Sequence, residues 1–308
     1  LHYPLRRQRQ MCIRDSRNIG LKRLEIANID NFTSNVGIKL RRMIFPAFKQ
    51  VLRLAVKRDI HFEGEYPVLE KDKPYIFVST HSFDEDIIAA IASLDRNAYI
   101  LMGTTDQIEH NPQMYAAWLN GMIYVDRTDK QNRHDAVSKM EKVINQGSSV
   151  LIFAEGGYNN SENLLCLEPF SSPWILSQKT GAQVVPLASF NSLNSNDIYI
   201  RFGKPIDLSI YDKKEARTVL RDQLASLVYP IMEEHAPRVK RSELGSDPRL
   251  DYMEERRQVY KKLKWTRDIW DEELTQYIPE EKRKPLILID PEEEKYDFKV
   301  YMKKNWNK

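Results

Sequence analysis

Between residues 59 and 236, short apolar runs of strand character alternate with stretches of helical periodicity. The strand-like runs are residues 59–64, 75–79, 98–102, 122–126, 150–154, 184–187 and 198–202. The helical patterns are residues 84–94, 112–119, 134–145, 173–180 and 213–234, and Gly181 is placed to end the fourth of them. Strands separated by helices predict an α/β fold, in which right-handed crossovers set helices against a sheet.

One strand–turn–helix stretch, PYIFVSTHSFDEDIIAA at residues 74–90, places polar side chains where a strand ends. His81 falls at the end of the strand and Asp86 in the first turn of the helix, so the chain reversal can bring the carboxylate to one imidazole nitrogen. A carboxylate there fixes the tautomer and leaves the other nitrogen to act as a base. Alone the spacing is weak: six His and 44 acidic residues in 308 give roughly one such match by chance. A histidine satisfied within a loop is the plain alternative.

Polar residues follow two further strands. Asp126 and Arg127 come after one apolar run, and Glu155 opens a Glu-Gly-Gly sequence after another. In open α/β sheets the chemistry lies beyond the carboxyl ends of the strands. We therefore expect these side chains to converge with His81 on one crevice.

Residues 38–58, IKLRRMIFPAFKQVLRLAVKR, combine a helical apolar pattern with charge of one sign. Pro46 is expected to kink or split this helix. Two interpretations stay open: a membrane-surface element on anionic lipid, or a core-packing helix with a solvated basic face. The one-sided charge favours lipid slightly, and with it a peripheral location on the cytoplasmic face of a membrane. The basic residues are Lys39, Arg41, Arg42, Lys49, Arg53, Lys57 and Arg58.

Residues 1–16, LHYPLRRQRQMCIRDS, resemble a translated sequencing-library adapter and are expected to be non-native. They carry four Arg and one Asp, a charge of +3 that equals the net charge of the whole chain, so the remaining residues balance to zero. The basicity of the chain therefore gives no indication of nucleic-acid binding. Without Cys12, Cys166 is the one cysteine left, so no internal disulfide is expected and a reducing compartment fits.

The rest of the chain divides into three parts by composition. Residues 17–58 are expected to form a helical, membrane-facing segment, and residues 59–236 the α/β domain. Residues 237–308 are dense in charge, hold three of the five Trp, and are expected to be a mainly helical appendage with a short strand at 286–289. No run approaches eighteen consecutive apolar residues, so no transmembrane helix is expected.

Three blocks at strand ends, in fixed order, together resemble the glycerolipid acyltransferases, the 1-acylglycerol-3-phosphate acyltransferase family. The blocks are His81…Asp86, GMIYVDR at residues 121–127 and FAEG at residues 153–156. VVPL at residues 184–187 and FGKPI at residues 202–206 follow in the same order. The resemblance covers residues 59–206 and implies that family's α/β fold, a central mixed sheet flanked by helices.

The resemblance implies a single-step acyl transfer without a covalent enzyme intermediate. His81 would take the proton from an acceptor hydroxyl as the oxygen attacks an acyl thioester. Asp86 would orient the ring and stabilise the imidazolium that forms, with the substrate's hydroxyl in the place of a catalytic serine.

The resemblance also implies which residues bind the acceptor. Arg127 would hold the acceptor's phosphate in a guanidinium fork, although a surface salt bridge is its plain alternative. Glu155 and Gly156 would help to build the acceptor pocket, and with Gly157 would let backbone amides approach an anion. Pro186 would line the acyl or active-site wall, or else simply end a strand.

The third block departs from the family pattern. The family commonly continues with Thr-Arg-Ser, whereas this chain continues GYNNS at residues 157–161, so a second phosphate-binding Arg is missing. Ser171 and Ser172 follow Phe170, where a Lys or Arg is usual. Asn159 and its neighbours offer neutral donors that suit hydroxyls or a less charged head group. A phosphorylated acceptor would therefore depend on Arg127.

The implied partners are acyl-CoA or acyl carrier protein as co-substrate, a lysophospholipid-like acceptor such as 1-acylglycerol-3-phosphate, and a membrane surface. No bound cofactor or metal is expected, since the chain has no metal-ligand spacing, phosphate-cradling glycine loop or dinucleotide fingerprint. Two alternatives remain: a non-catalytic lipid-binding protein of the same fold, and a hydrolase of acyl esters or thioesters. The chain has no Gly-x-Ser-x-Gly elbow, and Cys166 has no neighbouring base that the sequence can identify.

Overall fold

A computed structural model describes ten segments of the chain: residues 33–56, 58–81, 86–103, 117–126, 129–157, 159, 165–191, 195–236, 238–240 and 296–298. The structural statements that follow concern these segments. The expected non-native segment 1–16, most of the helix expected at 112–119, and the strand expected at 286–289 lie outside them.

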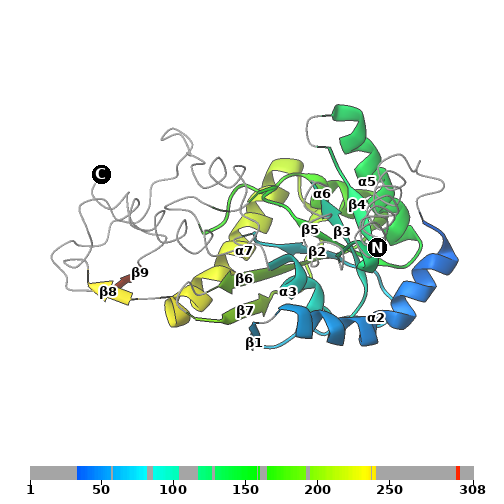
Figure 1. Cartoon of the computed structure of the whole chain (residues 1–308). Helices are drawn as coiled ribbons and strands as arrows, with labels where there is room; N and C mark the ends of the chain where they lie inside the picture. The colour runs from blue at the N-terminus through cyan, green and yellow to red at the C-terminus, as the bar shows by residue number, and fades with distance from the viewer. Residues whose placement is uncertain are drawn as a thin grey trace, which may run out of the picture.

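A seven-stranded sheet forms the centre of the molecule, in the order β1-β7-β6-β2-β5-β3-β4 (Figure 1). Strands β4, β3, β5, β2 and β6 run parallel to one another, β7 is antiparallel to β6, and β1 is parallel to β7. The sheet is therefore mixed, which confirms the expected fold class. The strands are β1 Asp59–Glu63, β2 Ile76–Ser79, β3 Ala98–Met102, β4 Met122–Tyr124, β5 Ser149–Phe153, β6 Val184–Asn191 and β7 Asp197–Phe202.

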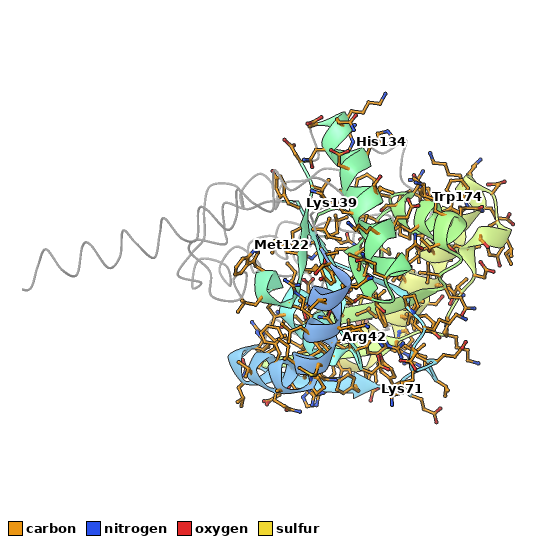
Figure 2. The ribbon with its side chains drawn as sticks, turned by 90° about the vertical axis from the view of Figure 1, so that its right-hand side faces the viewer. Arg42, Lys71, Met122, His134, Lys139 and Trp174 are labelled. Carbon is orange, nitrogen blue, oxygen red and sulfur yellow. The ribbon has the colours of Figure 1, made fainter. Side chains whose placement is uncertain are left out.

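Helices cover both faces of the sheet. Helices α2 and α3 pack on one face, and α5, α6 and α7 pack on the other; Figure 2 labels Arg42 on α2 and Trp174 on α6, one from each layer. The helices are α2 Asn35–Val56, α3 Asp86–Ser93, α5 Lys130–Asn145, α6 Ser172–Thr180 and α7 Lys213–His235, with a 3-10 turn η1 at Leu208–Ile210. Strands β8 Arg238–Lys240 and β9 Tyr296–Phe298 form a separate antiparallel pair.

The two-sided cover explains the continuous apolar sequence of the central strands. Tyr75 and Phe77 belong to the core cluster beneath α2 and α3, whereas Ile76 and Val78 belong to the cluster beneath α5, α6 and α7. Successive side chains of a strand point to opposite faces, so a strand buried on both faces has to be apolar at every position.

Two prolines lie inside elements that continue past them. Helix α2 is not split, because it runs from Asn35 to Val56 with Pro46 inside it on an exposed position, where water can satisfy the carbonyl that loses its donor. Strand β6 does not end at Pro186 but continues to Asn191. The Pro186 carbonyl accepts the Gly203 amide at 2.8 Å, just past the end of β7. Pro186 has no N–H to donate, but on this side it lies opposite residues beyond the end of β7, so no hydrogen bond between β6 and β7 is lost.

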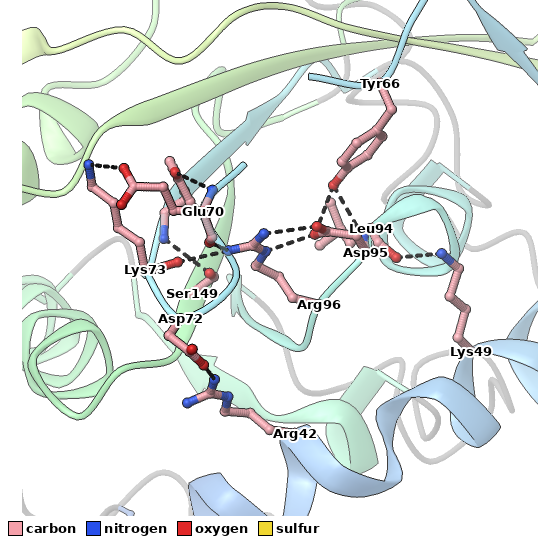
Figure 3. Close-up of polar contacts among 11 residues, drawn as sticks. Arg42, Lys49, Tyr66, Glu70, Asp72, Lys73, Leu94, Asp95, Arg96 and Ser149 are labelled. Carbon is pink, nitrogen blue, oxygen red and sulfur yellow. Dashed lines mark hydrogen bonds and ion pairs between the residues drawn. The ribbon is translucent and has the colours of Figure 1, made fainter. Parts of the chain in front are cut away.

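A polar network closes the amino-terminal edge of the parallel strands (Figure 3). The Arg96 guanidinium donates to the carbonyls of Glu70 and Lys73 at 2.9 and 2.8 Å and pairs with Asp95. Lys49 of α2 donates to the Leu94 carbonyl just past the end of α3, which satisfies a group that a helix end leaves open. The network fastens α2 to the edge opposite the carboxyl ends of β2 and β5.

Candidate active site

His81 and Asp86 meet directly after strand β2. The His81 Nδ1 atom lies 3.1 and 3.0 Å from the two carboxylate oxygens of Asp86. Asp86, the first residue of α3, is 0% exposed, and the His81 side chain is 13% exposed. A buried carboxylate is costly unless it is paired, so this contact fixes the imidazole with Nδ1 toward Asp86. The sequence prediction of this contact is confirmed.

The backbone of His81 is held on both sides by the segment that follows β5. The His81 N–H donates to Glu155 Oε1 at 3.0 Å, and the His81 carbonyl accepts the Asn159 N–H at 2.7 Å. One residue earlier, the Thr80 N–H donates to the Leu187 carbonyl of β6 at 3.2 Å. The position of His81 thus depends on both strands that flank β2.

Glu155 is buried, and both of its carboxylate oxygens accept backbone amides. Its second oxygen, Oε2, accepts the Leu167 N–H at 2.7 Å, and the residue is 7% exposed. Burial raises the pKa of Glu155 to about 8; the two amide donors oppose this shift, and the negative charge of Asp86 adds to it. The family resemblance assigned Glu155 to an acceptor pocket; in the structure its carboxylate accepts the main-chain amides of His81 and Leu167.

Aromatic rings border this turn. Gly156 has φ +73°, and a Cβ built on it would lie 2.1 Å from Cε2 of Phe170, whose own N–H donates to the Ala154 carbonyl at 2.7 Å. The Phe153 ring lies 4.6 Å from the His81 ring, centroid to centroid. Phe153 belongs to the FAEG block, two residues before Glu155, whereas Phe170 is fourteen residues after Gly156 in the chain, so no local signal predicted its contact with Gly156.

The other residues that the sequence assigned to acceptor binding do not share one environment. Asn159 is 2% exposed and holds the His81 carbonyl through its backbone. Pro186 lies level with Val78 in the β2–β6 register, three residues before His81. A Cβ on Gly157 would meet nothing within 4 Å. Arg127 lies outside the described residues.

Cys166, the cysteine that a hydrolase could use, is an unsuitable nucleophile. Its thiol is 4% exposed and donates to the Leu167 carbonyl at 3.2 Å. Burial, with the nearby Glu155 carboxyl, raises the pKa of the Cys166 thiol well above its ordinary value. Because the thiolate is the reactive form, the surroundings of Cys166 favour a packing role.

Sequence comparisons point to one family. The acyltransferase family model matches residues 59–189. A protein named 1-acyl-sn-glycerol-3-phosphate acyltransferase from Haemophilus influenzae is 27% identical over 126 residues, 38% of this chain and 49% of the relative. A protein of the same name from Borreliella burgdorferi is 29% identical over 117 residues, 34% of this chain and 46% of the relative. The chain thus spans about half the length of the curated relatives it matches.

A solved structure shares the fold. The 1-acyl-sn-glycerophosphate acyltransferase from Thermotoga maritima superposes with a TM-score of 0.51 at 17% sequence identity, covering 65% of this chain and 84% of the other. The likeness at this identity concerns the fold. His81, Asp86, Glu155 and Pro186 all lie within the residues that the family model matches.

Proposed function

We propose an activity from the premise that this chain belongs, through residues 59–189, to the glycerolipid acyltransferase family. The activity is transfer of a fatty acyl group from an acyl thioester, acyl-CoA or acyl carrier protein, to a hydroxyl of a lysophospholipid-like acceptor. The observation that carries it is the contact of His81 Nδ1 with the buried Asp86 carboxylate, because this is the arrangement that a histidine general base requires.

In the proposed reaction His81 carries one proton from the acceptor to the leaving group, and no covalent enzyme intermediate forms. His81 Nε2 accepts the proton of the acceptor hydroxyl as its oxygen forms a bond to the thioester carbonyl carbon. The carbon–sulfur bond then breaks, and the leaving thiolate takes the proton back from the imidazolium. Asp86 stabilises the imidazolium between these events and holds the Nδ1–H tautomer, and no bound cofactor takes part.

The acceptor is a lysophospholipid such as 1-acylglycerol-3-phosphate, or a relative with a less charged head group. Arg127 is the family-matched cation for a phosphate, and the second arginine of the family pattern is missing from residues 157–161. A non-catalytic lipid-binding protein would not need a buried carboxylate on an imidazole. The burial of Cys166 argues against a cysteine hydrolase.

An acceptor panel tests this function. Purified protein is incubated with radiolabelled acyl-CoA or acyl carrier protein and a series of lysophospholipids, glycolipids and long-chain alcohols. Labelled ester should form only when an acceptor is added, and His81→Ala should lower turnover by about two to four orders of magnitude. Full activity in His81→Ala would reject the proposal, and release of free fatty acid without any acceptor would favour a hydrolase.

We further propose that α2 docks on a membrane surface through a face turned away from its own core contacts. Its buried residues are Ile38, Phe45, Leu52 and Val56. A second apolar set is exposed: Val36, Leu40, Met43, Ile44, Ala47, Val51 and Leu54. At roughly 100° per residue the centres of the two sets lie about 180° apart. One face therefore packs on the core, and the opposite face is free for the proposed lipid contact.

The basic residues of α2 divide between the domain and the surface. Lys49 and Arg53 donate to the carbonyls of Leu94 and Ala92, and Arg41 donates to the Tyr99 hydroxyl. Lys39 is exposed, and Arg42 is exposed beside the surface residue Asp72 (Figure 3). An exposed apolar stripe with Lys39 beside it fits an anionic lipid surface, at the cytoplasmic face of a membrane. Among the described helices, none is both long and apolar enough to cross a bilayer.

A further inference from the structure

The segment after β5 holds His81 through Glu155. We propose that Glu155 is a positioning residue whose ionised carboxylate sets the backbone of His81 and favours the imidazolium, an inference that rests on the proposed acyl transfer. The role differs from acceptor binding, because both carboxylate oxygens are directed at amides of the protein's own chain, those of His81 and Leu167.

The hydrogen bonds at Glu155 are matched best by an ionised carboxylate, because both of its oxygens accept. An ionised carboxylate accepts the amides of His81 at 3.0 Å and Leu167 at 2.7 Å together. A glutamine side chain would accept one of these two amides through its oxygen. Its NH₂ group would then face the other amide N–H, and two donors cannot form a hydrogen bond. Glu155 is 7% exposed, so water has little access to replace a lost bond.

The charges around Glu155 make its effect depend on pH. Asp86 from α3 and the Cys166 thiol face Glu155 from neighbouring segments. The His81 imidazole belongs to the residue whose backbone amide donates to Glu155. Burial raises the pKa of Glu155 from 4.5 to about 8. Above about pH 8 the carboxylate is ionised, accepts both amides, and adds a negative charge near the imidazolium of the transition state. Activity should therefore rise as pH passes through this value.

Folding stability should change in the opposite direction. A carboxyl group whose pKa is raised in the folded state binds a proton there that the unfolded chain has released. The stability linked to that proton is fully present below about pH 4.5 and is lost as pH rises through about 8. If Glu155 served stability alone, activity and stability would fall together as pH rises. If it positions His81, activity should rise with pH while stability falls.

The experiment compares the intact protein with Glu155→Gln from pH 6 to pH 10. The control is Glu141→Gln, whose carboxylate pairs with Lys179 between α5 and α6. Steady-state kcat and KM are measured with one acyl thioester and one acceptor, and melting temperature is measured in the same buffers. We expect the ratio of wild-type kcat to that of Glu155→Gln to grow about tenfold between pH 7 and 9, as the ionised fraction grows, with little change in KM. The melting temperature of the wild type should fall with pH relative to that of Glu155→Gln.

The outcomes separate this inference from the proposed function. A wild-type protein that forms no ester with any acceptor rejects the acyl transfer itself. If the wild type is active and His81→Ala is inactive, a Glu155→Gln protein with a wild-type kcat at every pH overturns the positioning role. Glu155→Asp, which keeps the charge on a shorter side chain, provides a second variant and should recover part of the pH dependence. Parallel loss of activity and stability with pH in the wild type also overturns it, without any variant.

Discussion

At the scale of single residues, the buried Asp86 carboxylate is the group that most constrains the site. It is 0% exposed, and both of its oxygens lie within 3.1 Å of His81 Nδ1. An ionised carboxylate without a partner would be costly at this depth. The same contact that offsets this cost also orients the imidazole, so stability and chemistry depend on one pair.

Asp86→Asn should lower kcat with a smaller effect on KM. Asparagine has the shape of the carboxylate, but it lacks the negative charge and can turn an NH₂ donor toward the Nδ1–H. We expect a loss of about ten- to a thousandfold, smaller than that of His81→Ala because the base remains. Steady-state kinetics at several acceptor concentrations measures it, and a wild-type kcat for Asp86→Asn would contradict the assigned role.

Gly156→Ala should lower both stability and activity. Its φ of +73° disfavours a side chain, and the new Cβ would lie 2.1 Å from Phe170. We expect a loss of more than about 1 kcal/mol in the free energy of unfolding. Gly157→Ala is the matched control, because its Cβ would meet nothing within 4 Å, and it should be close to neutral. The double variant with Phe170→Ala should recover the part due to the clash but not the part due to φ; no recovery would mean that the ring is not the obstacle.

Arg127→Ala tests the phosphate contact that the sequence predicts. A hydrogen-bonded ion pair contributes roughly 1.5–3 kcal/mol, so KM for a phosphorylated acceptor should rise about tenfold or more. The KM for an uncharged acceptor should change less. Equal effects on both acceptors would show that Arg127 does not bind the phosphate.

At the scale of elements, α2 has two apolar faces with different surroundings. The face with Phe45 and Leu52 lies in the core, whereas the face with Met43 and Leu54 is exposed. A single amphipathic pattern places apolar residues on one face, so a second exposed stripe among the described residues agrees with the proposed contact of α2 with a lipid surface. The exposed Lys39 beside this stripe fits the anionic lipid surface that we propose.

Met43→Asp together with Leu54→Asp should release the protein from vesicles of phosphatidylglycerol and phosphatidylcholine. Each large apolar side chain buried in the interface contributes about 1.5–3 kcal/mol, so the pair should lower the partition coefficient at least a hundredfold. Val68→Asp is the control, since Val68 is 99% exposed but lies outside α2. Sedimentation with vesicles measures binding, and unchanged sedimentation of the double variant would remove α2 from the membrane contact.

At the scale of the whole molecule, a stack of rings joins elements at a sheet edge away from the proposed chemistry. The proposed chemistry lies after β2 and β5, whereas β1 is an edge strand that pairs with β7. At that edge Tyr199 stacks on His235 of α7 at 3.7 Å and on His61 of β1 at 5.2 Å. Each imidazole also pairs with a carboxylate, His235 with Glu63 and His61 with Asp197. This stack joins β1, β7 and the end of α7.

Tyr199→Ala should destabilise the protein while leaving kcat of the folded fraction unchanged. The loss of two ring contacts and of partly buried area should cost about 1–3 kcal/mol. Urea unfolding measures the loss, and Tyr199→Phe, which keeps the ring, should be near wild type. A change in kcat well below the unfolding transition would show that this edge is coupled to the site.

Much of the architecture could be predicted from the sequence because its signals are local. The alternation of strand and helix patterns placed all seven strands of the central sheet, and Gly181 ends α6 with φ +67° as expected. The contact of His81 with Asp86 was also predictable, since five residues and one chain reversal join them. Such features depend on residues close in sequence, whose geometry is limited by backbone conformation.

Only the tertiary structure decided what distant residues do to one another. Glu155 lies 74 residues after His81 in the chain, and nothing in either segment shows that its carboxylate accepts the His81 amide. The same holds for the ring of Phe170 against Gly156, and for which face of α2 meets the core. The sequence shows which positions of a helix are apolar, but the burial of each face depends on which neighbouring elements cover it. That choice is made by packing across the whole fold, because the hydrophobic effect acts on area removed from water and not on position in sequence.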